Sequence, residues 1–254
     1  IICTDKTGTL TENSMQVAVI YDFATNKYFN YPAAQVQPNE VLAYAMWSSE
    51  SVPFDPMEKS IHTLYEQSFT IDDRPLYKMV HEYPLDGAPP VMTHVFRNAA
   101  NDTIIACKGG VESILRQSVL TDEQKQQMLE VTQQLSAQGY RVLAVAKSAK
   151  SYDKFPATQA EFDYTFLGLI AFSDPPKKNT ASIITSFYQA GIGVKMITGD
   201  YAPTAIAIAK QIGIQNHQAV LTGDEIMLMD AVTIQEKVKA TNVYARMFPE
   251  AKLK

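Results

Sequence analysis

The sequence predicts a two-domain α/β protein, in which an α+β domain interrupts a doubly wound parallel sheet. In the last third, strand-like runs at Phe166–Phe172 and Gly193–Ile197 enclose a helical run at Asn179–Ala190. Val243–Ala245 is a further short strand candidate. Strands that alternate with helices are typical of a parallel sheet, whose ligands lie at the carboxyl ends of the strands. A first strand at Ile1–Thr4 completes this predicted sheet.

The middle of the chain mixes strands and helices without that regular alternation. Strands are predicted at Met15–Tyr21, Leu76–Tyr83, Val91–Phe96, Thr103–Cys107 and Arg141–Ala146, and helices at Glu40–Trp47, Pro56–Gln67, Val111–Arg116 and Thr121–Gln138. The simplest arrangement is an α+β domain at 13–165 inserted into an α/β domain formed by 1–12 and 166–254.

Composition limits the class of protein. Of 254 residues, 46% are hydrophobic and 19% are charged, which is globular composition. The net charge of −5 argues against nucleic acid as the main partner. The two cysteines are far apart, and the four histidines show no ligand spacing and are expected at or near the surface.

No run approaches the roughly 20 apolar residues that a membrane-spanning helix needs. The chain begins without a methionine, inside a strand-like run, and ends abruptly at Lys254. We therefore expect a piece of a longer protein.

The strongest chemical motif follows the first strand. Asp5 begins the heptad Asp-Lys-Thr-Gly-Thr-Leu-Thr, which ends at Thr11. An aspartate at the carboxyl end of a parallel strand is well placed to attack a phosphoryl group. The short residues after Asp5 allow backbone N–H groups to approach phosphate oxygens. An Asp-Lys pair alone would more often be an ordinary polar turn, and it is the whole heptad that favours chemistry.

This heptad resembles, at every position, the phosphorylation motif of P-type ATPases, which belong to the haloacid-dehalogenase-like superfamily. The resemblance implies that Asp5 accepts the phosphate, and that Mg²⁺ is held by Asp5 and the backbone carbonyl of Thr7. Phosphatases of the superfamily usually carry a second Asp where this chain has Thr7. A threonine hydroxyl cannot take up a proton near neutral pH as a carboxylate can, so the acyl phosphate should be long-lived.

Further segments resemble family motifs in the expected order. Thr198-Gly199-Asp200 is similar to the motif whose threonine holds a phosphate oxygen, and Asp200 is expected to contact the nucleotide. Pro249-Glu-Ala-Lys252 resembles the segment that supplies the catalytic lysine, so Lys252 is the candidate. Asp174-Pro-Pro-Lys177 resembles the hinge motif, with Lys where Arg is more usual. Taken singly, these would be a strand-end turn and solvated surface groups.

The inserted domain carries the candidate nucleotide residues. Lys108-Gly109-Gly110 resembles the family's Lys-Gly-Ala motif at the adenosine site. Glu58 resembles the glutamate that lines the family's nucleotide pocket. Arg141 resembles the arginine that contacts the ATP phosphates. Where related pumps carry a Phe that stacks on adenine, this chain has Leu85. Tyr83 is the nearby aromatic residue that could take the place of that Phe. The heavy-metal branch of the family uses a His-Pro pair. None of the histidines here precedes a proline, so the chain resembles the calcium- or sodium-pump branch instead.

The resemblance implies an enzyme that hydrolyses ATP with Mg²⁺ and moves a cation across a membrane. This chain would be its cytoplasmic part, and the helices that select the ion would lie outside it. With the second magnesium carboxylate of the family expected beyond residue 254, we expect this chain to bind ATP weakly and to phosphorylate itself poorly. Two alternatives stay open: a superfamily phosphatase or phosphomutase with a large cap, and a nucleotide-binding module without catalysis.

Overall fold

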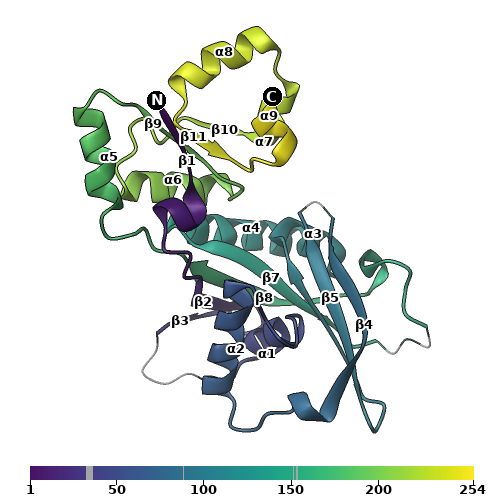
Figure 1. The fold of residues 1–254 in the computed structure, drawn as a ribbon. Coiled ribbons are helices and arrows are strands. Elements are labelled where there is room, and N and C mark those ends of the chain that lie inside the picture. The colour runs from purple at the N-terminus through teal and green to yellow at the C-terminus, as the bar shows by residue number, and fades with distance from the viewer. Residues whose placement is uncertain (33–36, 88, 151, 153) are drawn as a thin grey trace. The chain divides into compact units, whose positions relative to one another are not determined.

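A computed structural model describes residues 1–32, 37–87, 89–150, 152 and 154–254. The chain forms two compact units (Figure 1). The smaller unit comprises Ile1–Ser14, Gln133–Arg141 and Ser173–Lys254, and the larger unit comprises Met15–Thr132 and Val142–Phe172. Each unit contains its own sheet and its own hydrophobic core.

The larger unit is built on a seven-stranded sheet in the order β3-β2-β8-β7-β6-β5-β4. Its strands are β2 (Gln16–Asp22), β3 (Lys27–Asn30), β4 (Tyr77–Asp86), β5 (Val91–Asn98), β6 (Thr103–Gly109), β7 (Arg141–Ser148) and β8 (Thr165–Ser173). The neighbours β2–β3, β4–β5, β5–β6 and β6–β7 run antiparallel. Short 3₁₀ turns lie at Arg74–Leu76 and Gln159–Glu161.

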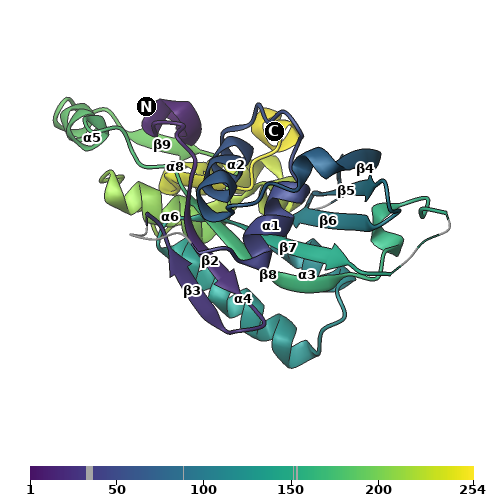
Figure 2. The ribbon, with the colours of Figure 1, turned by 90° about the horizontal axis from the view of Figure 1, so that it is seen from below.

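Helices cover both faces of this sheet (Figures 1 and 2). On one face lie α1 (Glu40–Trp47) and α2 (Pro56–Ser68), and on the other α3 (Val111–Gln117) and α4 (Asp122–Ala137). Both helices of the first pair begin at a side-chain cap, because Asn39 accepts a hydrogen bond from Leu42 N–H and Asp55 accepts one from Met57 N–H. These caps fix the starts of the helices at Glu40 and Pro56, which are the predicted first residues.

The smaller unit contains a fully parallel four-stranded sheet in the order β1-β9-β11-β10. Its elements are β1 (Ile2–Asp5), β9 (Val194–Ile197), β10 (Val220–Thr222), β11 (Val243–Ala245), α5 (Thr180–Gln189), α6 (Ala202–Gln211), α7 (Gly223–Leu228), α8 (Ala231–Ala240) and α9 (Pro249–Leu253). Val243 and Ala245 pack with residues of α5 and α6, whereas Tyr244 packs with residues of α7, α8 and α9. The sheet is therefore covered on both faces, as expected of a parallel sheet.

One predicted strand belongs to the other sheet. Residues 166–172 were expected in the parallel sheet, but β8 lies between β2 and β7 in the larger unit. The strand is buried along almost its whole length, so it reads as a continuous apolar run. Such a run indicates burial on both faces and not strand direction or partner. The observed units accordingly divide at Ser14/Met15 and Phe172/Ser173, with Gln133–Arg141 grouped in the smaller unit.

The expectation that the histidines lie at the surface is wrong for two of them. His94 is 0% exposed and His62 is 8% exposed. His94 lies on β5, on the sheet face covered by α1 and α2, where its ring contacts Phe96. Of the two cysteines, Cys107 is buried and Cys3 is exposed.

Across the part of the chain that the structure describes, none of the helices combines the length and the apolar character needed to cross a bilayer.

Gly168 of β8 lies directly against the backbone of β2 and the side chain of Val41. A Cβ at this position would lie 2.1 Å from the Tyr21 carbonyl oxygen and 3.0 Å from Val41 Cγ2. The adjacent backbone is fixed by a hydrogen bond from Phe23 N–H to Leu167 O of 3.0 Å. The backbone of β2 therefore leaves no room for a side chain at residue 168.

Gly168→Ala should lower the free energy of unfolding of the larger unit by about 1–3 kcal/mol, because β2 and β8 must move apart. The sequence's single tryptophan, Trp47, lies in the core of this unit, so its fluorescence during denaturant unfolding reports the loss. Gly193→Ala is the control, since its Cβ would meet only Ile1 Cγ1, at 3.8 Å. An unchanged midpoint for Gly168→Ala would contradict this packing.

Candidate functional site

The first candidate site lies at the carboxyl edge of the parallel sheet in the smaller unit. Asp5 ends β1 and is in register with Ile197, the last residue of β9. Tyr244 of β11 is in register with the same residue. Because parallel strands share one carboxyl edge, Asp5 and Thr198 emerge side by side there. Lys252 lies in α9, the helix that follows β11.

The loop after Asp5 is a single wide turn at Lys6–Leu10. It is closed by a hydrogen bond of 3.1 Å from Thr11 N–H to Lys6 O. Gly8 has a φ of 76°, which a residue with a side chain rarely adopts, so the glycine of the motif is needed here. Lys177 Nζ donates to Gly8 O at 2.7 Å, and Thr180 Oγ1 donates to Leu10 O at 2.9 Å. The segment after β8 therefore holds the loop in place.

Lys6 is the electrostatic centre of this loop. Its side chain is only 2% exposed, and its Nζ lies 3.2 Å from Asp174 Oδ2 and 3.0 Å from Asp200 Oδ2. Asp174 Oδ2 also accepts a hydrogen bond of 2.7 Å from Thr11 Oγ1. Two carboxylates thus replace the water around the buried ammonium, and they attach the loop to the ends of β8 and β9.

The four predicted catalytic residues have different surroundings. Asp5 is exposed, and its Oδ1 accepts a hydrogen bond of 3.0 Å from Lys6 N–H. Thr7 and Lys252 are also exposed. Thr198 is 2% exposed, and its hydroxyl accepts a hydrogen bond of 3.1 Å from Asp200 N–H. The Asp5 carboxylate is therefore open to a ligand, while Lys6, Thr11 and Asp174, which hold the loop, are buried.

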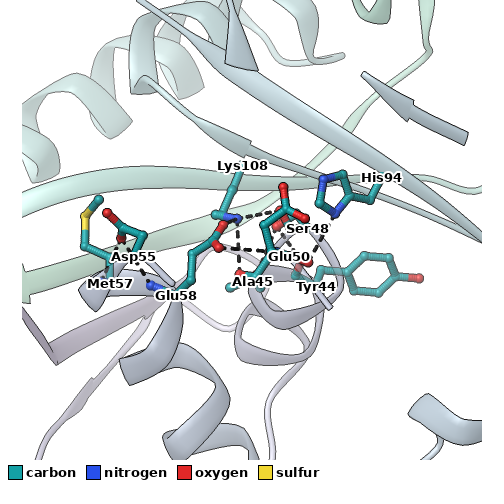
Figure 3. A network of polar contacts seen from close by, with 10 residues as sticks. Tyr44, Ala45, Ser48, Glu50, Asp55, Met57, Glu58, His94 and Lys108 are labelled. Atoms are coloured by element: carbon teal, nitrogen blue, oxygen red, sulfur yellow. Dashed lines mark hydrogen bonds and ion pairs between the residues drawn. The ribbon is translucent and has the colours of Figure 1, made fainter. Parts of the chain in front are cut away.

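The second candidate site lies in the larger unit and is centred on Lys108 of β6. Lys108 is 4% exposed, and its Nζ donates to Glu58 Oε1 at 2.7 Å and to Ser49 Oγ at 3.1 Å. Its third partner is the Ser48 carbonyl, at the C-terminus of α1, where a cation is favourable (Figure 3). Burial lowers the pKa of Lys108, and Glu58 acts against that shift.

Glu58 is positioned by the first turn of α2. Asp55 caps this helix, and Pro56 occupies its first position. The second carboxylate oxygen of Glu58 accepts a hydrogen bond of 3.3 Å from Glu50 N–H. Glu58 thus joins β6 to the turn after α1, so the predicted pair of Glu58 and Lys108 is in direct contact (Figure 3).

The glycines after Lys108 are explained by packing within the protein. A Cβ on Gly109 would lie 2.5 Å from Pro90 O, and one on Gly110 would lie 2.2 Å from Pro89 Cβ. Gly110 N–H also donates to Pro90 O at 2.9 Å. The structure therefore gives a reason for both glycines that does not depend on a ligand.

Leu85, Tyr83 and Arg141 have different surroundings. Leu85 is 62% exposed and lines a hollow of about 490 Å³ together with Arg116 of α3 and Gln159. Tyr83 is 7% exposed, and its hydroxyl donates to Pro156 O at 2.6 Å. Tyr83 also packs edge-on against the Phe162 ring, so its ring offers no open face for a base. Arg141 is the exposed first residue of β7.

The family is decided by comparison with known proteins. Residues 52–179, slightly more than half of the chain, match the family model of the P-type ATPase cytoplasmic domain N. The chain belongs to the P-type ATPase family. The matched segment of this P-type ATPase contains Lys108 and Glu58, while Ser48 and Ser49, the other partners of Lys108, precede it.

Relatives cover the rest of this P-type ATPase chain as well. Calcium-transporting ATPase 1 of Bacillus cereus is 29% identical over the whole chain, and calcium-transporting ATPase 1 of Saccharomyces cerevisiae is 30% identical over the whole chain. Magnesium-transporting ATPase, P-type 1 of Salmonella typhimurium is 27% identical over 98% of it. The chain spans 31%, 31% and 28% of these relatives, or about a third of their length.

Sequence reasoning missed the role of Lys6 and gave Asp200 a different one. Lys6 was only the second letter of a motif, and Asp200 was predicted to contact nucleotide. In the structure the two form a buried ion pair in the smaller unit, with Asp174 as the third member. A signal for the pair of Lys6 and Asp200 was present in the sequence, because each follows a strand of the predicted parallel sheet and the ends of such strands meet at one edge.

Lys6→Met should destabilise the smaller unit by about 3–5 kcal/mol, because it leaves Asp174 and Asp200 buried without their cation. Hydrogen–deuterium exchange of peptides from β1 and β9 should speed up accordingly. Lys178→Met is the matched control, since Lys178 is exposed and its loss should have little effect on exchange in β1 and β9. Equal protection in both variants would show that the buried ion pair does not stabilise the sheet.

Proposed function

We propose that this chain carries the phosphate acceptor and the ATP site of a cation-transporting P-type ATPase, with Asp5 as the acceptor. The observation that supports this most is the position of Asp5. It is exposed at the carboxyl edge of a parallel sheet, beside Thr198, on a loop held by a buried lysine. The smaller unit would then be the phosphorylation domain, with a haloacid-dehalogenase-like fold, and residues of the larger unit the inserted nucleotide-binding domain.

In the proposed reaction, an Asp5 carboxylate oxygen attacks the γ-phosphorus of ATP, the bond to the β-phosphate oxygen breaks, and ADP leaves. Backbone N–H groups of the Lys6–Leu10 turn and the Thr198 hydroxyl would orient the phosphoryl oxygens. Lys252 would offset their negative charge. Thr7 provides no carboxylate that could activate water, so the aspartyl phosphate would persist long enough to drive transport.

The chemistry of the donors fits Mg²⁺, the metal that the family implies. Asp5 offers an exposed carboxylate, and Thr7 is an exposed residue whose carbonyl can supply a second hard oxygen ligand. When bound there, the ion would supply positive charge near the transferring phosphoryl group. Asp5 itself would keep one oxygen for attack.

ATP would bind on the larger unit near Lys108, Glu58, Gly109 and Gly110. The Lys108 ammonium donates to three protein groups, and its bond to Ser49 Oγ is the longest measured, at 3.1 Å, against 2.7 Å to Glu58. Nucleotide would replace that contact most readily. Leu85 would offer an apolar surface to the base, because Tyr83 is buried.

The relatives that cover this chain are named for calcium or magnesium transport. We therefore propose that the natural protein hydrolyses ATP and moves a cation across a membrane, with this chain on its cytoplasmic side. The ion would be selected by membrane helices outside residues 1–254.

Asp5→Asn should abolish phosphorylation, because the amide cannot form an acyl phosphate. The assay uses the natural gene product that contains this chain, in membranes, with γ-labelled ATP and Mg²⁺. The wild-type label should be released by hydroxylamine, which cleaves acyl phosphates. Asp22→Asn, on a strand of the larger unit, is the control and should keep full labelling. Label that survives in Asp5→Asn, or that resists hydroxylamine in the wild type, would rule out Asp5 as the acceptor.

A further inference from the structure

Three metal-ligating side chains that the proposed ATPase chemistry does not use lie together in the larger unit. They are Glu50, Glu82 and His94, and one ligand atom from each lies within 4.8 Å of the others. Glu50 follows α1, Glu82 lies on β4, and His94 lies on β5. They come from three separate elements, so the fold and not a local run of acidic residues brings them together.

Strand pairing places two of these residues side by side. Glu82 and His94 are directly opposite each other in the antiparallel pair of β4 and β5. Residues in such a pair project to the same face of the sheet, with Cβ atoms about 4.5–5.5 Å apart. Glu50 reaches this position from the turn after α1, where its N–H is held by Glu58 Oε2.

The hydrogen bond of His94 determines what its other nitrogen can do. Nδ1 lies 3.1 Å from the Ser49 carbonyl oxygen. A carbonyl oxygen can only accept, so Nδ1 carries the hydrogen, and the neutral ring has its free lone pair on Nε2. Metal-bound histidines commonly show this arrangement, in which the other ring nitrogen donates to a backbone carbonyl.

The free nitrogen of His94 is buried without a hydrogen-bond partner. His94 is 0% exposed, and Nε2 makes no hydrogen bond to the described residues. Figure 3 shows that this nitrogen points toward the Glu50 carboxylate. A buried polar atom is normally satisfied, so an unpaired nitrogen beside two carboxylates indicates a ligand between them.

We propose that Glu50, Glu82 and His94 form a binding site for a divalent transition-metal ion of the Zn²⁺ or Mn²⁺ class. One imidazole nitrogen with two carboxylates is a donor set that these ions accept, and three protein ligands leave a position open to water or substrate. Metal bonds of about 2.0–2.2 Å place ligand atoms at most about 4 Å apart. The ligand atoms lie within 4.8 Å of one another, and the exposed side chain of Glu82 is free to move its carboxylate closer to the other two.

This metal site is attached to the Lys108 site through shared groups. Ser49 accepts from His94 through its carbonyl and from Lys108 through its hydroxyl. Glu50 contributes its carboxylate to the metal site, while its backbone N–H is bound to Glu58. Metal binding would therefore fix the turn at Ser48–Glu50 that surrounds the lysine. The metal site itself does not require that the chain binds ATP.

The test is isothermal titration calorimetry of this chain with ZnCl₂, and separately with MnCl₂, in the absence of nucleotide. A Cys3→Ser background removes the exposed thiol, which could bind Zn²⁺ on its own. We expect one site of micromolar or tighter affinity for at least one of the two ions. Glu82→Gln should weaken binding at least tenfold, and His94→Gln should do the same.

Glu236→Gln, an exposed glutamate on α8, is the matched control and should leave the affinity unchanged. Glu82 is exposed, so its variant should fold even if substitution of His94 disturbs the core, and Trp47 fluorescence checks both. Imidazole resonances provide a direct readout, because metal on Nε2 shifts the ring signals of His94. Binding weaker than millimolar for both ions, or equal affinity in Glu82→Gln, would overturn the proposal.

Discussion

A lysine ammonium can be buried only where carboxylates and carbonyl oxygens replace its water, and both candidate sites of this chain depend on that constraint. Lys6 is held by Asp174 and Asp200, and Lys108 by Glu58 with the carbonyl of Ser48. Lys6 and Asp174 are 168 positions apart in the sequence, so this ion pair joins the first and the last segment of the smaller unit. In each case the buried charge positions a loop, and in the Lys6 loop Asp5 and Thr7 are exposed and available to a ligand.

Much of the fold could be predicted because it is encoded locally. The helix at Glu40–Trp47 was predicted to the residue, since its apolar positions lie within one short segment. The β5 and β6 strands begin where predicted, at Val91 and Thr103, because each is a short run of apolar and β-branched residues that follows turn-forming residues. The loop from Asp5 was identified by a motif, and its glycine indeed has a positive φ.

What could not be predicted depends on contacts between distant segments. The apolar run at 165–173 shows that β8 is buried on both faces, but not that its neighbours are β2 and β7. Gly109 was explained by its motif at the adenosine site. In the structure, a side chain at this position would collide with the backbone at Pro90. His94 was expected at the surface because a lone histidine has no pattern, and only strand pairing places it beside Glu82.

The central claim is a division of labour: nucleotide binds at Lys108 in the larger unit, and Asp5 in the smaller unit accepts phosphate. An ATP titration of the ¹⁵N-labelled chain, followed by amide chemical shifts, tests it most directly. We predict shifts at Ser48–Glu58 and along β6, an unchanged affinity in Asp5→Asn, and at least tenfold weaker binding in Lys108→Met/Glu58→Gln, which removes both buried charges together. Equal affinity in that double variant, once Trp47 fluorescence shows that it is folded, would contradict the account.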